Sequence, residues 1–145
     1  MAITELNKFR GKTFDGRWVH GAAIQHGARC FILAPSEWGG FNWEGGSFGY
    51  WVEHIEVDPA TVGQYTYIDD KRGHEIYKGD VVRLDANEPH TSESIAEVVW
   101  VRGCYYVQLS GSNYRLGGWI DNIEVIGNIH DNAELIPKTR EEIAT

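Results

Sequence analysis

Hydrophobic segments in this chain are short, and turn-forming residues interrupt them at close intervals. The apolar run from Arg29 to Ala34 ends at Pro35, which has no amide hydrogen with which to continue a strand. Farther along, residues 96–101 and 104–109 flank Arg102-Gly103, a dipeptide suited to a two-residue hairpin turn. Glycine makes up 17 of the 145 residues, which favours short strands and tight turns over long helices. The pattern predicts a mainly β protein with minor α structure.

The second half of the chain has the clearest strand pattern. A short strand over 81–85 is followed by a polar loop, 86–94, and then by the predicted hairpin. Residues 123–129 again alternate between two faces. Four or five short strands with one long polar loop are typical of a small barrel, and we expect an SH3-like one.

We divide the sequence into three parts. Residues 1–60 are predicted to form an N-terminal β-containing subdomain, in which Trp18–Gly21 is a short strand that stops at its glycine. Residues 61–136 would form the SH3-like barrel subdomain. Residues 137–145 are a charged tail in which Thr139 and Glu142 have the spacing of a helix capping box.

The charge and cysteine content narrow the class of protein. A net charge of -8 and a pI of about 5.1 disfavour binding to the phosphate backbone of nucleic acid. No stretch has the length of about 18 apolar residues that a membrane span needs, and no secretory leader is evident. The two cysteines, Cys30 and Cys104, are far apart and fit small apolar core residues in a reducing cytoplasm.

An acidic segment is the nearest approach to a catalytic or metal site. It contains the carboxylates and the imidazole of Asp69, Asp70, His74, Glu75 and Asp80. Lys71 and Gly73 stand where a calcium-binding loop needs oxygen donors, so that motif fails. The serine-nucleophile elbow, the phosphate-binding loop and the dinucleotide fingerprint are equally absent from the sequence. We therefore expect no enzyme activity, no cofactor and no metal.

An aromatic, glycine-rich loop over residues 38–51 is the feature that this reading leaves unexplained. We take four of its rings as interface candidates: Trp38, Phe41, Trp43 and Trp51. Exposed aromatic side chains on a loop mark protein or subunit interfaces, or platforms for stacking a ligand. The alternative is that they fold back to cap the core or to seal the two subdomains together. Trp100, Tyr105 and Tyr106, on the predicted hairpin, fit the core and the barrel surface better.

Several phrases of the sequence resemble the YopX family of phage and prophage proteins. The run TVGQYTYIDDKRGHEIYKGDVV (61–82) and the later IEVIGNI (123–129) are similar to the family signature, and FRGK (9–12) and WVHG (18–21) resemble its N-terminal half. One departure is Tyr67, which stands where the family usually has glycine. If that glycine serves a tight backbone position, the turn must differ here. The signature residues that we single out are Thr61, Gly63, Gln64, Gly73, Tyr77, Gly79, Asp80, Gly127 and Asn128.

The resemblance implies a phage-encoded protein of the bacterial host cytoplasm, with a β-containing N-terminal part and a barrel-like second part. It implies no catalytic residues, because the family has no established biochemical activity. We hypothesise a non-enzymatic accessory protein that binds a protein partner or a second copy of itself. The alternative is a nucleic-acid-binding small barrel with a basic stripe drawn from Lys78, Arg83, Arg102 and Arg115.

Overall fold

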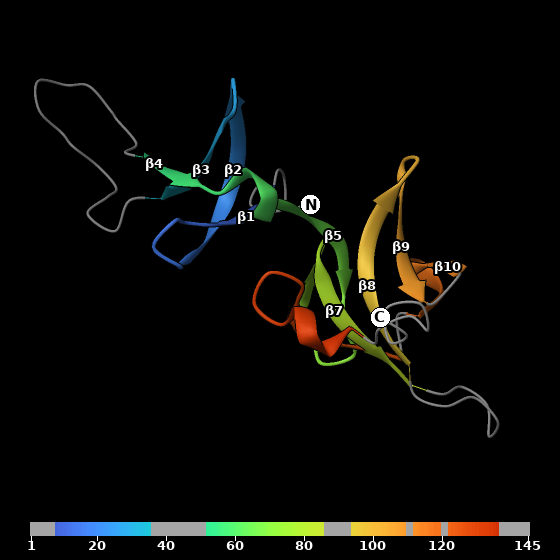
Figure 1. The fold of residues 1–145 in the computed structure, drawn as a ribbon. Coiled ribbons are helices and arrows are strands. Elements are labelled where there is room, and N and C mark those ends of the chain that lie inside the picture. Colours follow the sequence, from blue (N-terminus) through green and yellow to red (C-terminus); the bar gives the residue numbers. More distant parts are fainter. Residues whose placement is uncertain (1–7, 36–51, 86–93, 110–111, 120–121, 137–145) are drawn as a thin grey trace, which may run out of the picture. The chain divides into compact units, whose positions relative to one another are not determined.

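A computed structural model describes residues 8–35, 52–85, 94–109, 112–119 and 122–136 (Figure 1). These residues form antiparallel sheets, and their only helical structure is in short 3-10 helices. The prediction of a mainly β protein is therefore confirmed. No helix among them is long and apolar enough to cross a membrane. The chain divides into two compact units, Met1–Gln64 and Tyr65–Thr145, whereas the sequence suggested a boundary after residue 60.

The first unit is built by successive antiparallel strands. These are β1 (Phe9–Lys12), β2 (Trp18–His26), β3 (Arg29–Pro35) and β4 (Val52–Val57), followed by the 3-10 helix η2 (Pro59–Thr61). Neighbours in the chain pair in the order β4-β3-β2-β1, and the first two residues of β5 (Gly63–Asp69) add to β1. The fully buried apolar side chains described in this unit are Ile32 and Val57.

Gly21 is the point at which β2 changes its pairing partner. Residues 18–21 pair with β1, and residues 22–26 pair with β3. A Cβ atom at Gly21 would lie 1.9 Å from the carbonyl oxygen of Leu33, so only glycine lets the two backbones approach. The expectation that the strand stops at this glycine is wrong, because the missing side chain allows β2 to continue.

Backbone contacts fix the end of the first unit. The Asp58 side chain accepts a hydrogen bond from Ala60 N at 3.0 Å and so caps η2. Thr61 is buried, and its hydroxyl accepts from Lys12 N at 2.8 Å while it donates to Asp58 O at 2.6 Å. Asp58 N also donates to Lys12 O. These contacts hold the segment before β5 against β1.

The second unit contains the larger core. The rest of β5 pairs with β6 (Glu75–Tyr77), and five strands form a sheet in the order β10-β9-β8-β7-β11. Their bounds are β7 (Asp80–Leu84), β8 (Ser94–Val101), β9 (Cys104–Leu109), β10 (Ser112–Arg115) and β11 (Ile123–Asn128); the 3-10 helices are η3 (Leu116–Trp119) and η4 (Ala133–Leu135). The core cluster is Ile76, Val82, Leu84, Ala96, Val98, Val107, Leu116 and Ile123.

The β8–β9 hairpin turns where the sequence predicted. Val101 pairs with Cys104, and Arg102 and Gly103 have φ values of 48° and 83°. Positive φ at both central residues is characteristic of the type I′ turn, whose twist matches that of the flanking strands. The position of this hairpin was thus readable from local sequence.

The sheet of the second unit has the last strand beside the first. β11 pairs with β7, and η3 separates it in the chain from β10. Among the described residues, β10 and β11 are the two edges of this sheet, and no pairing between them closes it. The SH3-like barrel therefore stays a prediction. Residues 137–145, with the Thr139 and Glu142 spacing, lie outside the described residues.

Candidate functional site

Five aromatic side chains of the second unit form two neighbouring groups. Tyr65 and Tyr67 of β5 have ring centroids 5.0 Å apart, and Tyr65 and Tyr77 of β6 are 5.6 Å apart. Trp100 of β8 and Tyr105 of β9 are 4.6 Å apart in an edge-on arrangement. These separations are those of aromatic pairs in favourable contact. We call the five residues Tyr65, Tyr67, Tyr77, Trp100 and Tyr105 the ring cluster.

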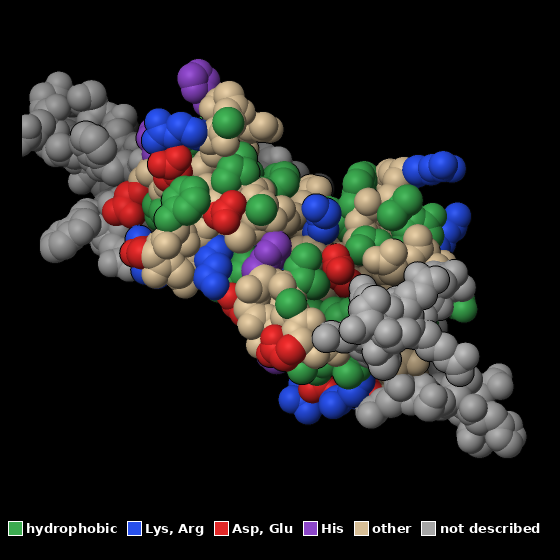
Figure 2. All heavy atoms as spheres, in the orientation of Figure 1, with side chains coloured by type: hydrophobic (Ala, Val, Ile, Leu, Met, Phe, Trp, Pro, Cys, Tyr) green, Lys and Arg blue, Asp and Glu red, His purple; other side chains and the backbone are tan. Residues whose placement is uncertain are grey.

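The second group, Trp100 and Tyr105, lies on the same face of the sheet as neighbouring core residues. Trp100 and Tyr105 are directly opposite each other, two residues along their strands from Val98 and Val107. Because strand side chains alternate, these four residues lie on one face. Tyr105 packs against the core cluster, whereas Trp100 is 48% exposed. On the face shown in Figure 2, hydrophobic side chains, a class that includes Trp and Tyr, gather over β8 and β9.

One electrostatic interaction relates the two groups. Burial raises the pKa of the Tyr105 hydroxyl, and the nearby hydroxyl of Tyr67 raises it further. Tyr67 is itself 48% exposed. The ring cluster therefore has a buried base, Tyr65 and Tyr77, and two half-exposed rings, Tyr67 and Trp100.

Tyr67 has a backbone conformation that tyrosine rarely adopts. Its φ is +64°, and the β5–β6 register is irregular between Tyr65 and Asp69. This left-handed conformation costs a residue with a Cβ about 1–2 kcal/mol. Arg102 also has positive φ but lies in a hairpin turn that requires it; Tyr67 lies within a strand. The backbone at position 67 thus has a conformation suited to glycine, although the residue there is tyrosine.

Two carboxylates adjoin the buried base of the ring cluster. The Tyr65 hydroxyl donates to Asp69 Oδ1, and the Tyr77 hydroxyl donates to Glu75 Oε1 at 3.2 Å. Burial, followed by the Asp69 carboxylate, raises the pKa of Tyr65 well above its usual value, so the hydroxyl stays protonated as a donor. Asp69 and Glu75 are register partners across β5 and β6. Like charges directly opposite each other on neighbouring strands are destabilising.

The other acidic residues of this segment serve the backbone. Asp70 is buried, and its carboxylate accepts from the N–H groups of Arg72, His74 and Val125 at 2.9–3.0 Å. Burial alone would raise the pKa of Asp70, but these three hydrogen bonds outweigh it and lower the pKa. Asp80 accepts from Tyr77 N at 2.8 Å. Within the described ranges, no group of three or more His, Cys, Asp or Glu side chains is placed to hold a metal ion.

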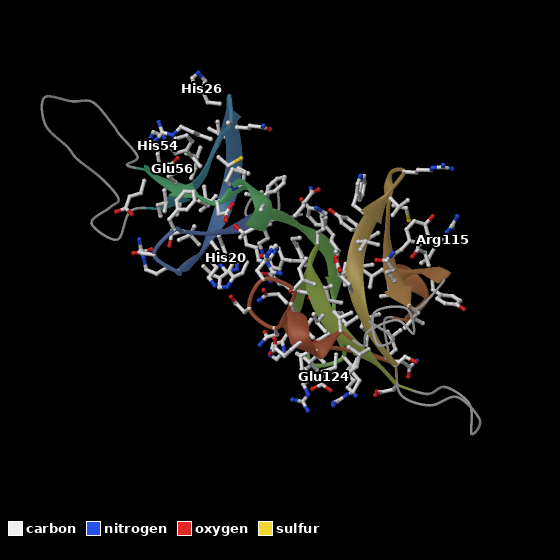
Figure 3. The ribbon with its side chains drawn as sticks, in the orientation of Figure 1. His20, His26, His54, Glu56, Arg115 and Glu124 are labelled. Atoms are coloured by element: carbon white, nitrogen blue, oxygen red, sulfur yellow. The ribbon has the colours of Figure 1, made fainter. Side chains whose placement is uncertain are left out.

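The residues of the expected basic stripe lie in different surroundings. Arg83 forms an ion pair with the buried Glu124, which Arg72 also approaches at 3.1 Å. Arg115 is exposed in a different part of the second unit from Glu124 (Figure 3). The charge of Lys78 acts on Glu97, whose pKa burial raises. Arg102 is exposed in the hairpin turn. Arg83, at Glu124, and Arg115 thus lie in different parts of the second unit (Figure 3).

Most of the family-signature residues lie in turns or at points where one part of the backbone comes close to another. Gly73 and Gly79 have φ of +83° and +91°, and Gly79 N–H donates to Val98 O while its carbonyl accepts from Ile129 N. A Cβ at Gly127 would lie 2.5 Å from Asn132 Oδ1. The Asn128 side chain accepts from His130 N and Asp131 N. In the first unit, Gly63 and Gln64 pair with β1, and Thr61 binds Lys12 N.

The four interface candidates from the aromatic loop, Trp38, Phe41, Trp43 and Trp51, lie outside the described residues. The ring cluster is an aromatic surface that sequence reasoning did not assemble. Its one local signal was Tyr67, a tyrosine at a position where the resembling family has glycine. No spacing rule relates residue 67 to residues 100 and 105.

Comparison with known proteins gives the class. The family model described as YopX protein matches residues 34–137, so the chain belongs to the YopX family, as the sequence phrases predicted. A crystal structure of protein EF1440 from Enterococcus faecalis is similar, with a TM-score of 0.61 and 20% sequence identity over 90% of this chain and 97% of that chain. At this identity the likeness shows the fold alone. No curated protein matches the chain.

Proposed function

We propose that this chain is a non-enzymatic, protein-binding member of the YopX family, which contacts its partner through the exposed part of the ring cluster. The phage or prophage origin and the bacterial cytoplasm that the family resemblance implies belong to the same proposal. The observation that carries it is the pair of half-exposed rings, Tyr67 and Trp100, on a packed aromatic base. Aromatic side chains at the centre of an interface supply most of its binding energy.

The backbone of Tyr67 supports a role in binding over a role in stability. A glycine would adopt a φ of +64° without strain. A tyrosine there retains a cost in stability and places a ring on the surface. Strained positions of this kind concentrate at binding and catalytic sites.

The overall charge favours a different protein over a second copy as the partner. The chain carries a net charge of -8, so two copies repel each other at low ionic strength. Short-range contacts can overcome that repulsion, and self-association is therefore one of the results that the experiment distinguishes.

Photo-crosslinking in bacterial cells tests the proposal. A photoreactive phenylalanine analogue replaces Trp100 in one variant and Tyr114 in a control variant, because Tyr114 is 47% exposed on β10 of the same sheet. We expect discrete protein adducts from position 100, much weaker ones from position 114, and loss of the first when Tyr67→Ser is added. An adduct of twice the chain mass of 16.4 kDa would identify a second copy. Equal adducts from both positions, or none from position 100, would contradict the proposal.

A further inference from the structure

The longest stretch of the sequence without an acidic residue is 98–120. All 21 Asp and Glu residues of the chain lie outside it, and its charged residues are Arg102 and Arg115. Its described residues form the end of β8, then β9, β10 and η3. The net charge of -8 is therefore carried by other parts of the chain, and this stretch is locally basic.

Both arginine side chains of this stretch are exposed. Among the residues that the structure describes, neither Arg102 nor Arg115 has an ion pair or a side-chain hydrogen bond. Other exposed arginines, by contrast, are paired with carboxylates: Arg17, Arg29 and Arg72. The two arginines of the acid-free stretch can thus bind an anion from outside the chain without first breaking an ion pair.

The strand register places polar side chains around Arg115. Arg115 lies opposite Tyr106, and Asn113 lies opposite Gln108. Because strand side chains alternate, these four residues share one face of the sheet, the face opposite to that of the core residue Val107. Tyr106 is partly exposed and the other three are exposed. We call these four residues the polar face; Figure 3 labels Arg115 on it.

The polar face has the three kinds of group that bind a single-stranded nucleic acid. A tyrosine ring stacks on any base, carboxamides both donate to and accept from base edges, and an arginine binds phosphate. Directly opposed side chains have Cβ atoms about 4.5–5.5 Å apart, so the ring and the guanidinium can contact a base and its own phosphate. Arg102, in the turn that leads into β9, supplies a second cation. Charge alone would suit an acidic peptide equally well, whereas the ring and the two carboxamides favour bases.

One carboxylate lies beside the polar face. Glu97 of β8 is opposite Gln108. Burial raises the pKa of Glu97, and the positive charge of Lys78 lowers it. In the row that contains Tyr106 and Arg115, the residue contributed by β8 is Val99. The phosphate-binding row therefore has no carboxylate of its own on β8, β9 or β10.

We infer that the polar face is a binding site for single-stranded nucleic acid. A base stacks on Tyr106, and the adjoining phosphate binds Arg115. Gln108 and Asn113 form hydrogen bonds with the base edge. The ring-cluster residues of β8 and β9 point to the other face of these strands, so this site is separate from the ring cluster and goes beyond the proposed function.

Fluorescence anisotropy of labelled oligonucleotides with the full-length protein tests the inference. The probes are short single strands of deoxythymidine or uridine and a DNA duplex of the same length. At low salt we expect the single strands to bind more tightly than the duplex, because a paired base cannot stack on the ring. Two phosphate contacts predict that the logarithm of the affinity falls with the logarithm of salt concentration with a slope of about -1.4.

Variants separate the contribution of the site from that of the net charge. Arg115→Gln should weaken binding and make the slope shallower by about 0.7, the value for one phosphate contact. Tyr106→Leu should weaken binding about tenfold and leave the slope unchanged. Arg17→Gln, which changes the net charge equally, and Tyr114→Leu, on the other face of β10, are the controls and should bind as the unchanged protein does.

NMR spectra of the isotope-labelled protein show whether each variant is folded and where the strand binds. In the unchanged protein, a single strand should shift the side-chain amide signals of Gln108 and Asn113. Shifts confined to other residues, absence of binding at low salt, or tighter binding of the duplex would each overturn the inference. Equal effects of Arg115→Gln and Arg17→Gln would do the same.

A glutamate peptide is the competitor that tests the class of ligand. At equal charge, it should displace the labelled strand less effectively than an unlabelled strand does. Equally effective displacement would overturn the inference in favour of an acidic protein segment. Because Trp100 is not part of the polar face, cross-linking from position 100 tests the proposed function independently of all these results.

Discussion

The two units of this chain are stabilised in different ways. Among the described residues, the buried apolar side chains of the first unit are Ile32 and Val57, whereas the second unit has eleven. The other contacts described in the first unit include strand pairing and exposed polar contacts, such as the bidentate ion pair of Arg29 with Glu56. Exposed ion pairs contribute little to stability, about 0–1 kcal/mol, and burial of apolar area contributes far more.

This difference has a consequence for function. A unit with a large core can retain a strained residue such as Tyr67, because the surrounding packing offsets the cost. The ring cluster lies in the second unit, beside the core cluster that Tyr105 contacts. The difference also teaches that strand pattern alone does not indicate how much each half of the sequence buries.

Removal of one buried isoleucine from each unit tests this comparison. Of the changes that we propose, it has the largest expected effect on stability. Ile32→Ala in the first unit and Ile123→Ala in the second each delete a fully buried side chain and should lower the free energy of unfolding by about 2–5 kcal/mol. Because Val57 is the other fully buried apolar side chain described in the first unit, we expect Ile32→Ala to abolish amide hydrogen-exchange protection throughout β2–β4. Ile123→Ala should lower protection in β7–β9 without removing it. The reverse order of protection would refute the comparison.

Substitution of Asp70 tests how much a buried polar contact adds to the stability of the second unit. Asp70→Ala leaves three backbone N–H donors without their acceptor and should cost about 3 kcal/mol, whereas Asp70→Asn keeps one acceptor oxygen and should cost about half as much. The matched control is Asp69→Asn, which leaves these three bonds in place. Urea denaturation measures each difference.

The pH dependence follows from the lowered pKa of Asp70. The unfolded chain has the ordinary aspartate pKa of about 3.9, so the folded state binds this proton less readily. The stabilisation is present above that pH and is lost as the pH falls toward the lower folded value. Asp70→Asn should therefore flatten the decline in stability below about pH 4. An unchanged slope would show that other carboxylates cause the decline.

Substitution of one glycine in each unit compares how well the two units tolerate close contacts. At Gly21 an added Cβ meets the Leu33 carbonyl oxygen, a backbone atom; at Gly127 it meets the Asn132 side chain. Gly21→Ala should cost about 3 kcal/mol and Gly127→Ala about 1 kcal/mol, the range for overpacking, because a side chain can move and a paired strand cannot. Gly117→Ala, where nothing lies within 4 Å, is the control. A larger cost at Gly127 would reverse the argument.

Substitutions of Tyr67 should have the smallest effect on stability. Tyr67→Gly and Tyr67→Ala both delete the ring, and they differ in the backbone cost at a φ of +64°. We expect the glycine variant to be the more stable by about 1 kcal/mol, as measured by thermal unfolding. Equal stability would show that the left-handed conformation is not maintained once the ring is gone.

Local sequence was sufficient for the class of fold and for individual turns. Short apolar runs and glycine content indicated strands, and Arg102-Gly103 marked the hairpin that the structure contains. The end of β2 was predicted wrongly at Gly21, because the carbonyl that explains this glycine belongs to Leu33 on another strand. The role of Asp70 could not be predicted for the same reason, because its third hydrogen-bond donor, Val125, is distant in the sequence.

The sequence by itself determined that this protein is mainly β and belongs to the YopX family, since strand alternation, turn residues and signature phrases are all properties of contiguous segments. Only the tertiary structure decided which aromatic residues share a surface. Tyr67 and Trp100 are separated by more than thirty positions, and residues of both their strands pack in or against one core cluster, Ile68 from β5 and Val98 from β8. That burial depends on which strands pair, and strand pairing has no fixed spacing in the chain.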